Sequence, residues 1–156
     1  RPRVMILAGS RRTDDPLAPA LRAELEAFEQ TGGRVVVIST NDLQFRTVHL
    51  DNAAGARDLA IVLADRGYRH VAILAATDGL KTSEDRVRGF VEGLAARGVD
   101  LDPAAIERTG FTRDGGYEGM QRLLATRRKI DLVFAVNDVM AVGALSAVRD
   151  AGLTPV

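Results

Sequence analysis

The sequence contains no cysteine, which excludes disulfide bridges, thiol nucleophiles, iron–sulfur clusters and zinc fingers. Its two histidines, His49 and His70, are the only sources of imidazole, and neither has other ligand-type residues at the spacing of a metal site. A phosphate-binding loop is also missing, because Gly110, Gly115 and Gly116 lack the lysine and the spacing of that motif. We therefore expect neither a metal nor a cofactor.

Catalytic groups are equally scarce. No serine occupies a Gly-x-Ser-x-Gly turn, so nucleophilic hydrolysis has no candidate residue. The adjacent carboxylates Asp14-Asp15 and Glu84-Asp85 point apart on a loop or helix, which favours a solvated surface over paired acid–base chemistry. We expect that the chain is not an enzyme.

An excess of charge of either sign is absent as well, because 21 lysines and arginines balance 21 aspartates and glutamates. A nucleic-acid surface usually needs a basic excess, so this chain is not expected to bind DNA by itself. No apolar run approaches the roughly 20 residues of a membrane span, and the start of the chain is not leader-like. These absences predict a cytoplasmic protein with no membrane partner.

What the chain does have is an ordinary globular composition, with 156 residues of which 46% are apolar and 27% charged. Apolar residues recur at helical spacing in five segments. These predicted helices lie within 17–28, 56–63, 87–94, 117–124 and 141–148. Four of them run into a glycine, the residue that most readily closes a helix in the left-handed conformation. The glycines are Gly32, Gly67, Gly98 and Gly152.

Short apolar runs rich in valine and isoleucine separate the predicted helices. They cover 4–8, 35–38, 71–75 and 130–136, with weaker candidates at 47–50 and 106–111. Continuous apolarity means that both faces of each strand are covered, as in a parallel sheet between two layers of helices. The sequence therefore predicts a doubly wound α/β fold.

Polar residues at 40–46 interrupt this pattern and mark a predicted boundary between two lobes. The part before it supplies two strands and one helix, which is too little apolar surface to cover both faces of a sheet. We expect residues 1–45 to be a partial amino-terminal lobe, and residues 46–156 to be a carboxyl-terminal lobe that lacks its last segment. The chain is thus expected to be cut at both ends.

Ligands of open parallel sheets bind beyond the carboxyl ends of the strands, so the residues that follow each apolar run are site candidates. Arg86 stands in the first turn of a predicted helix, where a cation is unfavourable unless a buried carboxylate or the oxygens of a ligand compensate it. The helix itself is expected to be capped by Thr82 or Ser83. Two other candidates are Asn137, which follows a predicted strand, and Phe111, which ends one.

Each of these two has a structural role and a binding role open to it. Asn137 follows the strongest strand, where capping the next helix is the simpler role, but its amide also suits a neutral polyol. Phe111 lies among small and polar residues, and is either part of the core or a stacking surface for a sugar ring or a base. The residues alone leave both pairs of roles open.

Four blocks of sequence stand in order along the chain. They read VHLDNAAGA at 48–56, RGYRHVA at 66–72, DRVRGF at 85–90 and FAVNDVMAVGAL at 134–145. Together they resemble the LacI/GalR family of transcription regulators, whose ligand domain has the fold of periplasmic sugar-binding proteins. Residues 3–40 resemble the later half of that family's amino-terminal lobe, with less distinctive motifs.

The resemblance implies a periplasmic-binding-protein-like fold with one lobe largely present and the other partial. It also implies a small effector in the cleft between the lobes, and a homodimer. Operator DNA would be bound only through a helix-turn-helix domain that is absent from this chain.

The resemblance also implies roles for single residues. Arg86 matches the arginine that binds effector oxygens, and Thr82 the hydroxyl residue one turn before it. Asn137 matches the effector-binding asparagine of sugar-responsive members, and Phe111 the aromatic that stacks on the ligand in some members. Two further residues match cleft-facing positions with more variable roles, namely Asp51 and Ser39.

We therefore expect an effector-sensing domain that binds a sugar or polyol and couples it allosterically to DNA binding. Leu80 supports this ligand class, because purine-responsive members carry a polar residue there. Three alternatives stay open. A transport solute-binding protein would carry an export leader, and a small α/β enzyme acting on phosphorylated substrates would show turnover. A plain dimerisation module would not be stabilised by any ligand.

Overall fold

The structure is a computed structural model that describes residues 3–9, 11–39, 43–77 and 79–154. The chain divides into two compact units. Unit 1 comprises Arg1–Asp51 and Gly79–Thr82, and unit 2 comprises Asn52–Asp78 and Ser83–Val156. The predicted lobe boundary at 40–46 falls partly on residues 40–42, which lie outside the described residues.

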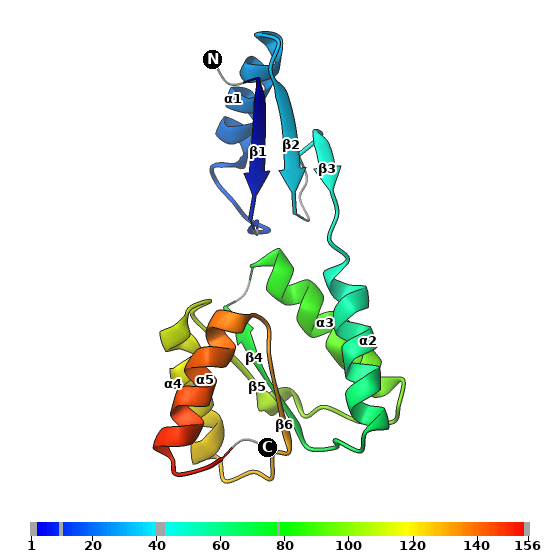
Figure 1. The fold of residues 1–156 in the computed structure, drawn as a ribbon, viewed down its shortest axis with the longest axis vertical. Coiled ribbons are helices and arrows are strands. Elements are labelled where there is room, and N and C mark those ends of the chain that lie inside the picture. Colours follow the sequence, from blue (N-terminus) through cyan, green and yellow to red (C-terminus); the bar gives the residue numbers. More distant parts are fainter. Residues whose placement is uncertain (1–2, 10, 40–42, 78, 155–156) are drawn as a thin grey trace. The chain divides into compact units, whose positions relative to one another are not determined.

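Unit 1 is built on a parallel sheet in the order β1-β2-β3 (Figure 1). Its strands are β1 (Val4–Ala8), β2 (Arg34–Ile38) and β3 (Arg46–Val48). Helix α1 (Ala18–Gln30) packs on one face, where Leu25 meets the buried side chains of Val35 and Val37. On the other face, Val4 and Ile6 are 55% and 63% exposed. Apolar side chains of β1 therefore stay in contact with water in the described part of unit 1.

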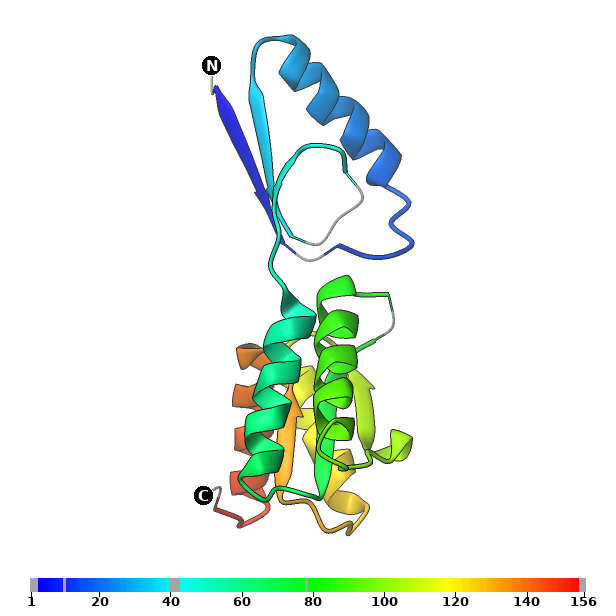
Figure 2. The same ribbon diagram turned by 90° about the vertical axis from the view of Figure 1, so that its right-hand side faces the viewer.

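Unit 2 is built on a second parallel sheet, in the order β5-β4-β6. The central strand is β4 (Val71–Ala76), flanked by β5 (Ile106–Thr109) and β6 (Leu132–Ala135). Helices α2 (Asn52–Asp65) and α3 (Lys81–Ala95) cover one face, and α4 (Arg113–Ala125) and α5 (Asp138–Asp150) cover the other (Figures 1 and 2). Every residue of β4 is buried, as expected for a strand covered on both faces.

Glycine allows the two helix pairs of unit 2 to approach closely. A Cβ atom added to Gly89 of α3 would lie 2.0 Å from the carbonyl oxygen of Ala53 in α2. A Cβ atom added to Gly143 of α5 would lie 1.9 Å from the carbonyl oxygen of Arg113 in α4. Any larger residue would have to push the backbones of the paired helices apart.

The predicted fold class is confirmed, and each predicted helix and strand is present, including the two weaker strands. The four predicted helix stops are confirmed too, because Gly32, Gly67, Gly98 and Gly152 all have positive φ angles between 66° and 98°. Four of the helices extend beyond the predicted apolar segments at both ends, whereas α1 begins one residue later than predicted, at Ala18, and extends only at its end. The strand predicted at 130–136 is shorter, and covers Leu132–Ala135.

One local prediction is wrong. Thr82 and Ser83 do not cap α3, because the helix already begins at Lys81 and both residues lie in its first turn. The hydroxyl of Ser83 instead accepts a hydrogen bond from the backbone N–H of Ala76, at 3.0 Å. Ser83 is completely buried. It therefore fastens the start of α3 to the end of β4.

Candidate functional site

The site candidates of unit 2 lie at the carboxyl edge of its sheet. The backbone pairing continues past the strands there, because the N–H of Thr77 donates to the carbonyl of Thr109 at 2.9 Å. On the other side of β4, the N–H of Val136 donates to the carbonyl of Leu74 at 3.0 Å. Helices α3, α4 and α5 follow these strand ends along the chain. Their amino termini and the polar residues beside them therefore share one edge.

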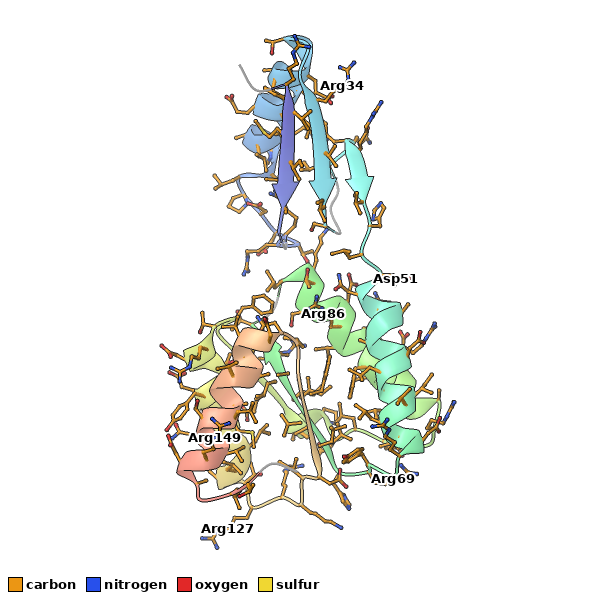
Figure 3. The ribbon with its side chains drawn as sticks, in the orientation of Figure 1. Arg34, Asp51, Arg69, Arg86, Arg127 and Arg149 are labelled. Atoms are coloured by element: carbon orange, nitrogen blue, oxygen red, sulfur yellow. The ribbon has the colours of Figure 1, made fainter. Side chains whose placement is uncertain are left out.

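Arg86 reaches this edge from the second turn of α3, one turn later than the sequence suggested (Figure 3). Its Nε donates a hydrogen bond to Oδ1 of Asn52 at 2.9 Å. Its Nη1 donates to the carbonyl oxygen of Val136 at 2.6 Å. Both acceptors are neutral, and the structure gives Arg86 no carboxylate partner within the described residues. Within the described part of the chain, no buried carboxylate compensates this cation.

The bonding of Arg86 leaves most of its donors available. A guanidinium carries five N–H groups, and the hydrogen bonds to Asn52 and Val136 use two of them. The side chain is half-buried, so water screens its positive charge less than it screens a charge on the open surface. Such a group can bind two oxygens of a ligand at once, whether these are hydroxyl or carboxylate oxygens.

Asn137 is the N-cap of α5, as the simpler interpretation predicted. Its Oδ1 accepts the backbone N–H of Met140 at 2.7 Å. The amino group of its amide has no hydrogen-bond partner among the described residues. Because Arg86 is bonded to the carbonyl of Val136, the structure brings the guanidinium to the backbone directly before Asn137.

Phe111 comes just after β5, and β4 lies between that strand and β6. The ring is half-buried and packs against the hydrophobic core of unit 2, which supports the structural role. The next residue, Thr112, caps α4 by accepting the N–H of Gly115 at 3.1 Å. A stacking role for Phe111 stays a prediction.

The other three predicted site residues belong to unit 1. Ser39 directly follows β2 and is 6% exposed, Asp51 directly precedes α2 and is exposed, and Thr82 is a half-buried residue of the first turn of α3. All three have interactions within the protein. Their proximity to Arg86, Asn137 and Phe111 stays a prediction.

Sequence reasoning missed Asn52 as a site residue. Asn52 lies inside the 48–56 block and begins α2, and no pattern in that block assigned its side chain a role. Its partner Arg86 is 34 residues away, and no local pattern signals such a contact. The only signal in the sequence was that Arg86 needed an acceptor.

The described part of the chain contains neither a cluster of metal-ligating side chains nor a helix that could span a membrane. No group of three or more histidine, cysteine, aspartate or glutamate side chains there is arranged to hold a metal ion. No helix in those residues is both long enough and apolar enough to cross a bilayer.

A parallel α/β unit with a cation and an amide at the carboxyl edge of its sheet has the arrangement of a ligand-binding domain. Comparison with known proteins agrees with this class. The family model described as "Periplasmic binding protein-like domain" matches residues 61–155. The chain belongs to this family, and its relatives are LacI-family transcription regulators, so the predicted resemblance is confirmed.

Three relatives illustrate the similarity. The HTH-type transcriptional repressor CytR of Escherichia coli (strain K12) is 35% identical over 112 residues, which cover 72% of this chain and 33% of CytR. A LacI-family regulatory protein from Chloroflexus aggregans has a TM-score of 0.77 and 26% identity, covering 97% of this chain and 53% of that one. The transcriptional regulator CelR in its cellobiose complex has a TM-score of 0.76 and 28% identity, covering 98% and 46%. The chain thus spans a third to about half the length of these relatives.

Proposed function

We propose that this chain is the effector-sensing part of a LacI-type transcription regulator, and that the effector is a sugar or a polyol. The observation that carries the proposal is the half-buried Arg86 at the carboxyl edge of the sheet. Among the described residues, it has neutral oxygen partners only and retains three N–H donors without a bond. The membership of the family supports it, as does CelR, whose solved complex contains cellobiose.

The proposed action is allosteric and not enzymatic. An effector that contacts one arrangement of the protein better than another shifts the population toward that arrangement. The shift would be transmitted to DNA-binding headpieces outside this chain, so operator DNA is a partner of the whole regulator. That role requires the cytoplasm, where operator DNA is found.

We further propose that unit 1, which contains residues 1–45, is the partial amino-terminal lobe, and that unit 2, which contains most of residues 46–156, is the carboxyl-terminal lobe. Effector contacts from Thr82, Asp51 and Ser39 belong to the same proposal. Phe111 would supply a stacking surface for the ring of a sugar.

A homodimer is part of the proposal, and α5 offers a surface for it. Val139, Val142 and Leu145 are 46%, 51% and 39% exposed on this helix. Helices α4 and α5 also form an open hollow whose lining contains both positive and negative side chains. The lining residues are Arg113, Asp114, Tyr117, Ser146, Arg149 and Asp150. Two arginines and two aspartates on one surface allow a second copy, turned about a two-fold axis, to match each charge with its opposite.

Calorimetric titration of the intact protein with cellobiose and a panel of monosaccharides and polyols tests the function. Arg86→Ala is expected to lower the affinity for the tightest-binding sugar about ten- to a hundredfold, because the substitution removes charge-assisted hydrogen bonds. Arg97→Ala is the matched control, since Arg97 is an exposed arginine paired with Asp65. Absence of binding by every compound contradicts the proposed function, and an unchanged affinity in Arg86→Ala contradicts the role of Arg86.

A further inference from the structure

The contact between Asn52 and Arg86 has a property that helix capping does not explain. Asn52 is the first residue of α2, yet its Oδ1 accepts from the Nε of Arg86 on α3 at 2.9 Å. A side-chain oxygen at a helix start ordinarily accepts a backbone N–H of its own first turn. This bond goes to the guanidinium that the proposed function places against the effector.

Two acceptors together fix the guanidinium. Asn52 holds Nε, and the carbonyl of Val136 holds Nη1. Because the two bonds engage different nitrogens of one rigid plane, they set both its position and its rotation. Val136 contributes backbone that is itself bonded to Leu74 of the central strand. Of the side chains that the structure describes, Asn52 is therefore the one that sets the orientation.

The packing of α2 on α3 places Asn52 accurately. The backbone of the next residue, Ala53, lies so close to Gly89 that a Cβ atom there would come within 2.0 Å of it. Gly89 is three residues beyond Arg86 on the same helix. The start of α2 is thereby held against the part of α3 that carries the guanidinium.

The chemistry of the acceptor also matters. A carboxylate at the position of Asn52 would bind two N–H groups of the guanidinium and neutralise its charge. The neutral amide binds one N–H group and leaves the charge in place, with three N–H groups not bonded to any described residue. The arginine is therefore oriented and still able to bind oxygens.

We propose that Asn52 is a positioning residue, which orients the guanidinium of Arg86 for effector oxygens while leaving its charge and remaining donors available. This inference rests on the proposed function for its consequence in binding. The orientation itself can be measured without an effector, so the two can fail separately.

The first test follows the Arg86 Nε–H proton by NMR in the intact protein. Asn52→Ala is expected to speed the exchange of this proton with water about tenfold, because the hydrogen bond that protects it is lost. Arg97 and Arg122 are internal controls, since their Nε atoms donate to Asp65 and Glu107 and should keep their exchange rates. An Arg86 exchange rate that is unchanged in Asn52→Ala overturns the inference, whether or not a sugar binds.

The second test measures affinity for the tightest-binding sugar of the panel. Asn52→Ala is expected to weaken binding about three- to tenfold, because the guanidinium is no longer oriented. Asn52→Asp is expected to weaken binding as well, because its carboxylate engages a second N–H group and neutralises the charge of Arg86. In an Arg86→Ala background, Asn52→Ala should have no further effect, which a general loss of structure would not produce. Equal losses with and without Arg86 overturn the positioning role. If Arg86→Ala lowers the sugar affinity and Asn52→Ala leaves it unchanged, the positioning role of Asn52 is overturned as well. The proposed function is then unaffected.

Discussion

Tyr117 and Asp150 show how a single contact on the surface changes the behaviour of a side chain. The hydroxyl of Tyr117 on α4 donates to Oδ2 of Asp150 on α5 at 2.9 Å. This hydrogen bond, together with the negative charge of the carboxylate, raises the pKa of Tyr117 above its ordinary value of 10.0. The neutral phenol is thereby favoured in the folded protein.

Replacing the carboxylate gives a direct prediction. In Asp150→Asn, the pKa of Tyr117 should fall toward its ordinary value, because the charged acceptor is gone. The contribution of this contact to stability is present below the ordinary pKa and is lost as the pH rises through the raised value. Ultraviolet titration of tyrosinate absorbance measures the shift, with Tyr117→Phe to assign the signal. Identical titration curves for the wild type and Asp150→Asn would contradict the prediction.

At this scale, local roles could be predicted from the sequence and distant contacts could not. The capping of α5 by Asn137 follows from its place directly between a strand and a helix. The acceptors of Arg86 depend on how α2 and β6 pack beside α3, which the sequence around Arg86 does not encode. Ser83 was misassigned for the same reason, since its partner Ala76 lies on the preceding strand.

Among the elements, the pairing of α4 with α5 depends on a glycine contact. Gly143→Ala should destabilise the protein by about 1–3 kcal/mol, because the added Cβ atom meets the backbone of Arg113, which cannot rotate away. Gly55→Ala is the matched control, since Gly55 lies in α2 with open space around it. The free energy of unfolding of this control should rise by about 0.5–1 kcal/mol, because alanine has a better helix propensity than glycine.

Chemical unfolding of both variants against the wild type checks this prediction. The two substitutions should move the unfolding midpoint in opposite directions. A Gly143→Ala protein as stable as Gly55→Ala would show that α4 and α5 can separate without cost.

The helices were predictable because apolar residues recur at helical spacing and most helices stop at a glycine. Most of the strands were predictable because they are short, continuous apolar runs rich in valine and isoleucine. Their ends were less so, because end residues are decided by neighbours in space. The strand predicted up to Val136 stops at Ala135, although Val136 remains bonded to Leu74 as the chain turns toward α5.

For the whole molecule, the proposed homodimer makes the clearest prediction. Val142→Glu should shift the protein from dimer to monomer, because it places a charge in the centre of the exposed apolar residues of α5. Sedimentation analysis over a range of concentrations measures the change. Val62→Glu is the matched control, since Val62 is 48% exposed on α2 and should leave the dimer intact. A wild-type protein that sediments as a monomer at high concentration would contradict the proposal.

Strand β4 is buried along its whole length and is hydrogen-bonded to a neighbour on each side. Its amide protons can reach water only when all of unit 2 opens, so they report the full unfolding free energy of that unit. In unit 1, β1 keeps Val4 and Ile6 in water, and less apolar burial opposes its release. We therefore expect the amide protons of β1 to exchange faster than those of β4, and a destabilising substitution to speed exchange first within the unit that contains it.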